Sequence, residues 1–451
     1  MRPSSQVVSR LLADYGMVFV LALLCAFFSF ATYTEQHPTG AEAGPELAAS
    51  ILSQSGKTAR VLIAVPNQPD AIAFADALQA ALANAGATVV ATVKGEPKDA
   101  RAALQAAASA GKLDVIAGTQ ASAGWLVFAE LATDFPALGT PRLVQPQTYR
   151  WPNFLKRDNL LNIANQIAVI AIVAIGMTMV IIGGGIDLSV GSLIALAAVL
   201  AALFIREFAG AQQATALGMT LACFAAILIA GGAGAVSGAM VTVFHLPPFI
   251  VTLAMMLVAS GEAYLLTHGQ SVYQVPDSFV WLGRGAGFLG LPNAVILMAL
   301  LYGVAHLVMS RTVLGRYLYA VGGNRLAARY SGVPVRRVLL LSYAVSGLLA
   351  GVGGVVLASQ LKSGSPTFGQ MYELYVIAAV VVGGASLNGG TGRMFGTLIG
   401  AFIIAVIQNG MNLMNVESYT QKVVLGLVIL GAVLLDLLRH RGWKLQLSAT
   451  E

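Results

Sequence analysis

Long apolar stretches separated by short polar segments dominate the chain after residue 151, and one more lies near its beginning. A helix that crosses the hydrocarbon core of a bilayer needs about 20 predominantly apolar residues. On that length, the pattern predicts one span within residues 1–34 and nine more in 151–438. The nine are expected near 159–182, 187–206, 214–243, 247–267, 291–309, 336–359, 373–387, 393–411 and 420–438. The stretch 373–387 is short, so either a full or a partial span fits it.

The region 35–150 has a different pattern, because no apolar stretch in it approaches the length of a span. Strands and alanine-rich helices are predicted to alternate there, at 60–65, 70–85, 87–93, 97–110 and 113–117. Such alternation favours a parallel sheet. The region resembles one lobe of a periplasmic sugar-binding protein, a resemblance of fold that says little about function.

We therefore expect an all-α polytopic membrane protein of about ten transmembrane helices with an inserted small α/β domain. The expected segments are an N-terminal transmembrane helix in 1–34, an extracytoplasmic α/β insertion in 35–150, a membrane core in 151–438 and a cytoplasmic tail in 439–451. Composition supports a membrane protein, because 57% of the residues are hydrophobic and 10% are charged. Soluble globular proteins carry about 25% charged residues.

The 49 glycines fit helices that approach one another closely through small residues. The net charge of +6 is typical of basic cytoplasmic loops, so membrane lipid rather than nucleic acid is the expected surrounding. The two cysteines lie within apolar stretches and predict no disulfide. The five scattered histidines show no metal-ligand spacing, and no metal or cofactor is expected.

Arginine positions predict the orientation of the spans. Six arginines lie in 311–337 and further basic residues follow position 438, whereas the loops assigned to the opposite side carry isolated charges. The positive-inside rule then places both termini and the 310–337 loop in the cytoplasm, with 35–150 outside. The apolar stretch 16–31 follows Arg2 and Arg10, as in a signal peptide, but its length favours an uncleaved span by about three to one.

An acidic, glycine-rich break separates two of the apolar stretches. Its notable members are Gly184, Gly185, Asp187, Ser189 and Gly191. Polar groups are costly in hydrocarbon and are kept at helix ends, at membrane faces or along transport pathways. One hypothesis is an N-cap, in which Asp187 and Ser189 accept from the free N–H groups of the next helix; the other is a pathway or gating element. The free donors favour the cap by about two to one, and the two roles are compatible.

The segment 312–333 combines arginines with a short helical stretch flanked by glycines. Its simplest interpretation is a positive-inside loop. Such a loop needs only charge, however, whereas a short helix with the small side chains of Ala327 and Ala328 suits docking into a groove of a partner. The residues expected to form this docking loop are Gly315, Arg316, Gly323, Asn324, Ala327, Ala328 and Gly332.

A phosphate loop is suggested by Ser55-Gly56-Lys57-Thr58, but the motif fails three checks. Its first glycine would fall at Ile51, and the segment precedes a predicted strand instead of following one. The predicted orientation also places it outside the cell. Without a phosphate loop the chain is not expected to hydrolyse ATP or to be an enzyme.

Four motifs occur along the chain in a characteristic order. They are the glycine break, LPPFIVTL at 246–253, the loop 315–332 and GGASLNGGTG at 383–392. Together they resemble the permease subunit of the ribose/xylose/galactose-type family of ATP-binding-cassette (ABC) importers, over about residues 150–438. The resemblance adds Pro248, Phe249, Glu373, Gly383 and Gly384 to the expected pathway or gating residues.

The resemblance implies a homodimer in the bacterial inner membrane that imports a monosaccharide or a similar small polar solute. It also implies a separate cytoplasmic ATP-binding subunit that hydrolyses ATP and a periplasmic solute-binding protein. The segment 324–332 would couple the permease to the ATP-binding subunit. Two features depart from the family pattern: the insertion of about a hundred residues after the first span, and Tyr375 where an aspartate is common. The second departure puts the usual substrates in doubt.

Two other functions compete with this one. An ion-coupled secondary transporter of a small solute usually holds charged residues within its spans. Asp187, Glu262 and Asp436, which fall in the predicted spans, all lie toward span ends. A membrane-anchored sensor would need fewer spans and a cytoplasmic signalling domain.

Overall fold

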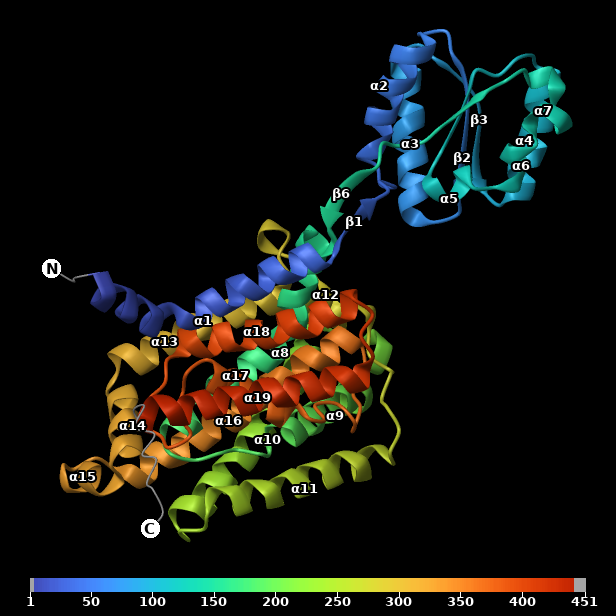
Figure 1. Cartoon of the computed structure of the whole chain (residues 1–451). Helices are drawn as coiled ribbons and strands as arrows, with labels where there is room; N and C mark the ends of the chain where they lie inside the picture. The colour runs from blue at the N-terminus through green and yellow to red at the C-terminus, as the bar shows by residue number, and fades with distance from the viewer. Residues whose placement is uncertain (1–3, 442–451) are drawn as a thin grey trace. The chain divides into compact units, whose positions relative to one another are not determined.

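The computed structural model describes residues 4–441, with side chains described over 16–434. The chain forms two compact units (Figure 1). Residues 33–152 make an α/β unit, and the segments before and after them make a helical unit. The last part of the expected cytoplasmic tail, 442–451, lies outside the described residues.

The α/β unit is a four-stranded parallel sheet in the order β3-β2-β4-β5, entered and left through an antiparallel ribbon of β1 and β6. Its strands are β1 (Tyr33–Gln36), β2 (Arg60–Pro66), β3 (Thr88–Gly95), β4 (Val115–Gly118), β5 (Arg142–Val144) and β6 (Tyr149–Pro152). Its helices are α2 (Ala43–Ser55), α3 (Pro69–Asn84), α4 (Pro97–Ser109), α5 (Gln120–Ala123), α6 (Leu126–Ala129), α7 (Leu131–Asp134) and the 3-10 turn η1 (Pro136–Leu138). The predicted strands, helices and parallel pairing are confirmed, whereas α2, β1, β5 and β6 were not predicted.

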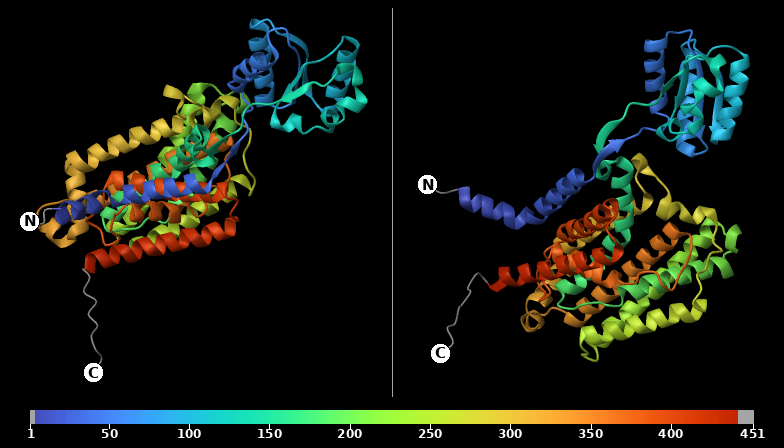
Figure 2. Two further views of the ribbon diagram at one scale, coloured as in Figure 1. Left: turned by 45° about the horizontal axis from the view of Figure 1, so that its top comes forward. Right: turned by 45° about the vertical axis from the view of Figure 1, so that its right-hand side comes forward.

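The side chains of strand β2 pack on both faces of this sheet. Val61, Ile63 and Val65 pack with α2 and α3 on one face, and Leu62 and Ala64 pack with α4 on the other. Alternate residues of a strand point to opposite faces, so an uninterrupted apolar run is what a strand covered on both sides requires. Figure 2 shows the helices lying against the two faces of the sheet.

Ten helices in the described part of the helical unit lie at the predicted spans. They are α1 (Ser4–Ala31), α8 (Arg157–Ile182), α9 (Val190–Phe208), α10 (Ala216–Thr242), α11 (Pro248–Thr267), α13 (Asn293–Arg311), α16 (Val335–Leu361), α17 (Tyr372–Val382), α18 (Met394–Leu413) and α19 (Ser418–Arg441). Short elements join them: η2 (Asn153–Leu155), η3 (Ala211–Gln213), η4 (Asp277–Val280), α12 (Trp281–Arg284), η5 (Phe288–Gly290), α14 (Val313–Gly323) and α15 (Arg325–Tyr330). Each predicted span falls on one of the ten longer helices.

Among the described residues, seven of these helices are long and apolar enough to cross a membrane: α8, α9, α10, α11, α13, α16 and α18. Within the residues whose side chains are described, the apolar stretches of α1 (16–31), α17 and α19 (418–434) are shorter. The shortest, α17, has 11 residues, about 16 Å at 1.5 Å per residue. It therefore makes only a partial span, one of the two possibilities left open by the sequence.

Helix α8 occupies the middle of the bundle. Of its most apolar 18-residue stretch, 89% is buried, whereas the same figure for α11 is 22%. Helices α10 and α16 pack most intimately, through glycines. A Cβ atom at Gly234 would lie 3.0 Å from the Cα of Gly347, and the reverse holds as well. This is how helices that share a lipid environment reach close contact.

Candidate functional site

Helix α8 ends in a glycine turn. The N–H of Gly185 donates to the carbonyl of Val180 (3.0 Å), and that of Gly184 donates to Ile181 (2.9 Å). Gly184 has a φ of 78°, in the left-handed region that favours glycine. The pattern is a Schellman motif, which satisfies carbonyls that a helix end leaves free. The turn sends the chain back toward the interior of the bundle, where α9 begins.

Asp187 lies within this returning segment and is fully buried. Its Oδ1 accepts from the Ser189 backbone N–H (3.0 Å) and the Ser189 hydroxyl (2.6 Å). Its Oδ2 accepts from the hydroxyl of Ser346 in α16 (2.8 Å). Ser189 is the residue preceding α9, but its side chain makes no cap hydrogen bond. The carboxylate thus binds one N–H just ahead of α9 and also ties the break to α16.

Ser346 stands near the middle of the 27-residue α16, which places the Asp187 network well inside the bundle. Tyr343, one turn earlier on α16, is 1% exposed. Its hydroxyl finds no hydrogen-bond partner among the described residues and lies against Gly185. The first turn of α11 also reaches the break, since the Thr252 hydroxyl lies 3.3 Å from the carbonyl of Ile186.

The starts of α9 and α17 meet in the same interior region. A Cβ atom at Gly191 would collide with the carbonyl oxygen of Gly369 and with the carboxylate of Glu373. Glu373 lies in the first turn of α17 and is half-buried. Tyr372 and Tyr375 belong to the same first turns of α17, and their ring centroids lie 6.3 Å apart. Carboxylates, hydroxyls and aromatic rings therefore gather where the two helices begin.

The predicted residues Pro248 and Phe249 open α11, with Pro248 as its first residue. The Phe249 side chain is 55% exposed on the outside of the helical unit. Thr252 rather than Phe249 makes the hydrogen bond that links α11 to the glycine break.

Helix α17 ends in the same turn as α8. Ala385 N–H donates to Val380 (3.1 Å) and Gly384 N–H donates to Val381 (2.9 Å), with φ of 91° at Gly384. A Cβ at Gly383 would lie 2.7 Å from the Cα of Thr397, so α17 and α18 touch through their backbones there. The two glycine turns, after α8 and after α17, are equivalent in hydrogen bonding.

The docking loop predicted from the sequence forms α14 and α15. Asn324 caps α15, its Oδ1 accepting from the N–H of Ala327 (2.9 Å). Ala328 is 5% exposed and packs against the rest of the bundle, whereas Ala327 is exposed. The expectation that both alanines share an outward face therefore fails for Ala328. The exposed large hydrophobic side chains of α15 are Leu326, 66% exposed, and Tyr330, 88% exposed.

The predicted glycines of this loop differ in their surroundings. A Cβ at Gly315 would lie 2.7 Å from the carbonyl carbon of Met309, which fixes the angle between α13 and α14. Gly332 has a φ of 83° and nothing near its missing side chain, so it serves the turn into α16. Gly323 also has nothing within 4 Å.

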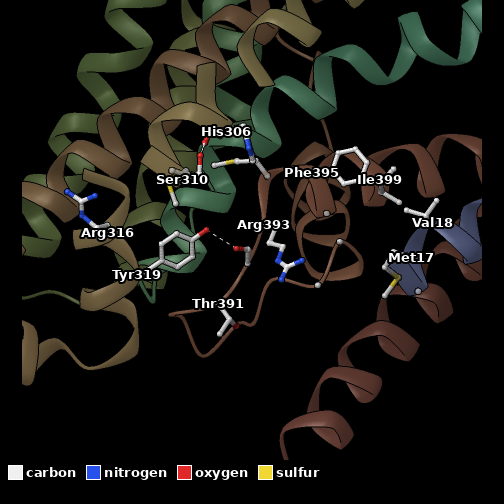
Figure 3. Close-up of a pocket in the computed structure, with 17 residues that line it drawn as sticks. Met17, Val18, His306, Ser310, Arg316, Tyr319, Thr391, Arg393, Phe395 and Ile399 are labelled. Atoms are coloured by element: carbon white, nitrogen blue, oxygen red, sulfur yellow. Dashed lines mark hydrogen bonds between the residues drawn. The ribbon is translucent and has the colours of Figure 1, made fainter. Parts of the chain in front are cut away.

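A cavity of about 1070 Å³ lies at the end of the helical unit that carries α14 (Figure 3). Its walls come from α1, α13, α14 and the segment 383–399, and they include Arg316, Gly383 and Gly384. The Tyr319 hydroxyl donates to the carbonyl of Gly392 (2.8 Å) at its edge. Burial raises the pKa of Tyr319, and the nearby Arg393 charge opposes part of that rise, so the hydroxyl keeps its proton and remains a donor.

Residues 159–433 match the family described as branched-chain amino acid transport system / permease component. The chain belongs to this permease family. The ribose import permease RbsC of Escherichia coli K12 is 44% identical over 289 residues, 63% of this chain and 87% of the relative. RbsC of Bacillus subtilis 168 is 42% identical over 303 residues, 67% and 91% of the two chains. The D-allose transport permease AlsC of Escherichia coli K12 is 36% identical over 283 residues, 63% and 84%. No solved structure matches the chain.

These matches confirm the resemblance to ABC importer permeases, and they lend no support to an ion-coupled transporter. The matched region begins after the α/β unit. Sequence reasoning missed several residues that the permease brings to the site. Ser346 and Tyr343 sit in an apolar stretch without a distinguishing signal, whereas Tyr319 and Gly322 lay inside the loop already singled out.

Proposed function

We propose that this permease forms the pathway for a monosaccharide, as a homodimer with a cytoplasmic ATP-binding subunit and a solute-binding protein. The observation that carries the proposal is the similarity, 44% over 87% of the relative, to a ribose import permease. The same proposal counts α1, α17 and α19 with the seven long helices as ten spans or partial spans. It places both termini and α15 in the cytoplasm and the α/β unit outside, on the arginine pattern.

The proposed pathway passes the starts of α9 and α17. Sugar hydroxyls need hydrogen-bond acceptors, and Glu373 is a half-buried carboxylate at this place. Tyr372 and Tyr375 add apolar ring faces with a polar hydroxyl, a combination suited to a sugar ring. Helices that begin inside a bundle are the usual way in which transporters present polar groups at membrane depth.

The solute is tested by uptake in cells that make the permease with its own ATP-binding and solute-binding partners. Radiolabelled D-ribose and D-allose are the probes, and cells lacking only the permease are the control. We expect uptake of at least one of the two to disappear in the control and to stop on ATP depletion. Uptake of both that is unaffected by loss of the permease would refute a role in importing either sugar.

Coupling is proposed to run through the outward face of α15. Leu326 and Tyr330 are four residues apart and so lie on one side of the helix, exposed together. The buried Ala328 holds α15 against the bundle instead of contacting the partner. An apolar helical face that enters a groove is a recurrent mode of recognition.

The coupling face is tested with Leu326→Asp and Tyr330→Asp, using Ala327→Ser as the matched exposed control. We expect the two aspartate variants to insert normally but to co-purify with at least tenfold less ATP-binding subunit. The control is expected to retain it. Retention of the ATP-binding subunit by both aspartate variants would show that α15 docks through another surface or not at all.

A further inference from the structure

Three backbone segments come into close contact at the α15 end of the helical unit. They are the end of α8, the end of α14 and the loop that follows α17. The N–H of Gly390 in that loop donates to the carbonyl of Ile182 at the end of α8 (2.8 Å). A Cβ at Gly389 would lie 3.0 Å from the Cα of Gly184 and 3.1 Å from the carbonyl oxygen of Gly322.

Gly322 is the tightest point of this junction. A methyl group there would overlap the Ile182 carbonyl oxygen and lie 2.5 Å from the Gly390 nitrogen. It would therefore push on α8 and on the loop after α17 at once. The neighbouring Gly323 has nothing within 4 Å. An added methyl group would therefore clash at Gly322 but not at Gly323.

A second contact joins the same elements. The hydroxyl of Tyr319, one turn before Gly322 on α14, donates to the carbonyl of Gly392 (2.8 Å). Figure 3 shows this bond reaching from α14 to the loop after α17. Helix α14 therefore holds that loop both through a hydrogen bond and through the glycine contact.

The junction adjoins both glycine turns, the one after α8 and the one after α17. The turn after α8 leads to Asp187 and the start of α9, and the turn after α17 ends the helix that carries Glu373. Packed interiors have low compressibility and transmit displacement. A contact made by backbone alone has no side-chain rotamer that could absorb a shift of α14.

We propose that Gly322 is a positioning residue that transmits displacement of α14 and α15 to the starts of α9 and α17, through the ends of α8 and α17. The inference deepens the proposed function and rests on α15 as the coupling face. It assigns the transmission to a backbone contact of α14, distinct from the exposed side chains of Leu326 and Tyr330. One rigid junction would move both turns together, so the pathway would respond to the partner as one element.

The test compares Gly322→Ala with Gly303→Ala, an addition at a glycine of α13 whose missing side chain meets nothing within 4 Å, in the complete importer reconstituted in proteoliposomes. Sugar uptake and ATP hydrolysis are both measured, and their ratio is the readout. We expect Gly322→Ala to keep the ATP-binding subunit and to hydrolyse ATP within twofold of the unaltered importer. Its uptake per ATP should fall at least tenfold, whereas Gly303→Ala should change neither rate by more than twofold. An unchanged ratio in Gly322→Ala, or an equal loss in both variants, would overturn the inference.

If Gly322→Ala does not yield folded protein, Tyr319→Phe decides the question, because it removes the bond to Gly392 without adding volume. We expect a twofold to fivefold lower ratio of sugar moved to ATP hydrolysed, and an unchanged ratio would overturn the inference. Failure here is distinguishable from failure of the proposed function. The α15 variants report on partner binding, whereas these variants report on the use of ATP by an assembled importer.

Discussion

The α/β unit and the helical unit are packed by opposite means. In the α/β unit, large side chains such as Phe74, Leu78 and Leu104 are fully buried between sheet and helices. In the helical unit, several of the closest contacts join backbone to backbone, as at Gly234 with Gly347. The hydrophobic effect in water stabilises the first unit. Lipid is as apolar as the side chains, so burying them between helices gains little free energy there, and close packing must supply the stability of the second unit. Removing atoms should therefore damage the first unit, and adding atoms should damage the second.

The largest effect is expected from Phe74→Ala, which empties a fully buried position between α3 and the sheet. Truncations of this kind cost about 3–5 kcal/mol, because lost burial and a cavity add together. Limited proteolysis of the full-length permease measures it. We expect new cleavage within 33–152 and an intact helical unit, since the cores are separate. Cleavage spread equally over both units would contradict separate cores.

A slightly smaller effect is expected from Gly234→Leu, an addition at the contact of α10 with α16. Overpacking costs about 3 kcal/mol where the backbone must move. The control is Gly232→Leu, two residues away, whose missing side chain meets nothing within 4 Å. Thermal unfolding in detergent should show a lower midpoint for Gly234→Leu alone. Equal unfolding midpoints for the two variants would mean that the close contact at Gly234 contributes nothing to the stability of the helical unit.

Asp187→Ala removes the acceptor of three hydrogen bonds inside the helical unit. Leaving buried donors unsatisfied costs about 1–3 kcal/mol, and Ser346→Ala, which removes one donor, should cost about 0.5–1.5 kcal/mol. Unfolding in detergent measures stability, and sugar uptake measures the role in the pathway. A folded Asp187→Ala protein that hydrolyses ATP but moves no sugar would favour gating. A protein unchanged in stability and uptake would eliminate both hypotheses.

The smallest effect is expected from deleting the α/β unit while keeping its ribbon. Gln36 lies opposite Tyr149 in the pairing of β1 with β6, so residues 37–148 can be replaced by an Asn-Gly turn. If the unit holds the solute-binding protein near the pathway, the half-saturating concentration of that protein should rise about threefold to tenfold, with maximal uptake preserved. An unchanged concentration dependence would leave a tolerated insertion, because long surface loops cost little free energy.

Prediction from the sequence succeeded to different depths in the two units. In the α/β unit, the apolar run 60–65 and the helices bounded by Pro97 and Gly111 placed most elements, because burial there leaves a local pattern. The ribbon was missed, since Thr34 and Trp151 pair across more than a hundred residues. Local pattern carries no information on such a pairing.

In the helical unit, the positions of the helices along the chain were predictable, but which side chains would face the neighbouring helices was not. Almost every residue of an intramembrane stretch is apolar, so Ser346 gave no sign that it would meet Asp187. The small side chains of α15 suggested an outward face, yet Ala328 turned inward because α15 packs on the bundle. The glycine break was visible as a departure from apolar sequence, but its contact with Gly389 depended on the fold.

Helix α1 has a consequence for the order in which the permease is assembled. The ring of Phe28 stacks on Phe154, with centroids 6.1 Å apart, and also fills the space above Gly410 in α18. Phe154 is synthesised soon after the α/β unit, whereas Gly410 follows about 250 residues later. Helix α1 therefore stays half-packed until α18 has been made. A ribosome stalled before residue 410 would leave α1 open to extraction, and release of the stall would close it.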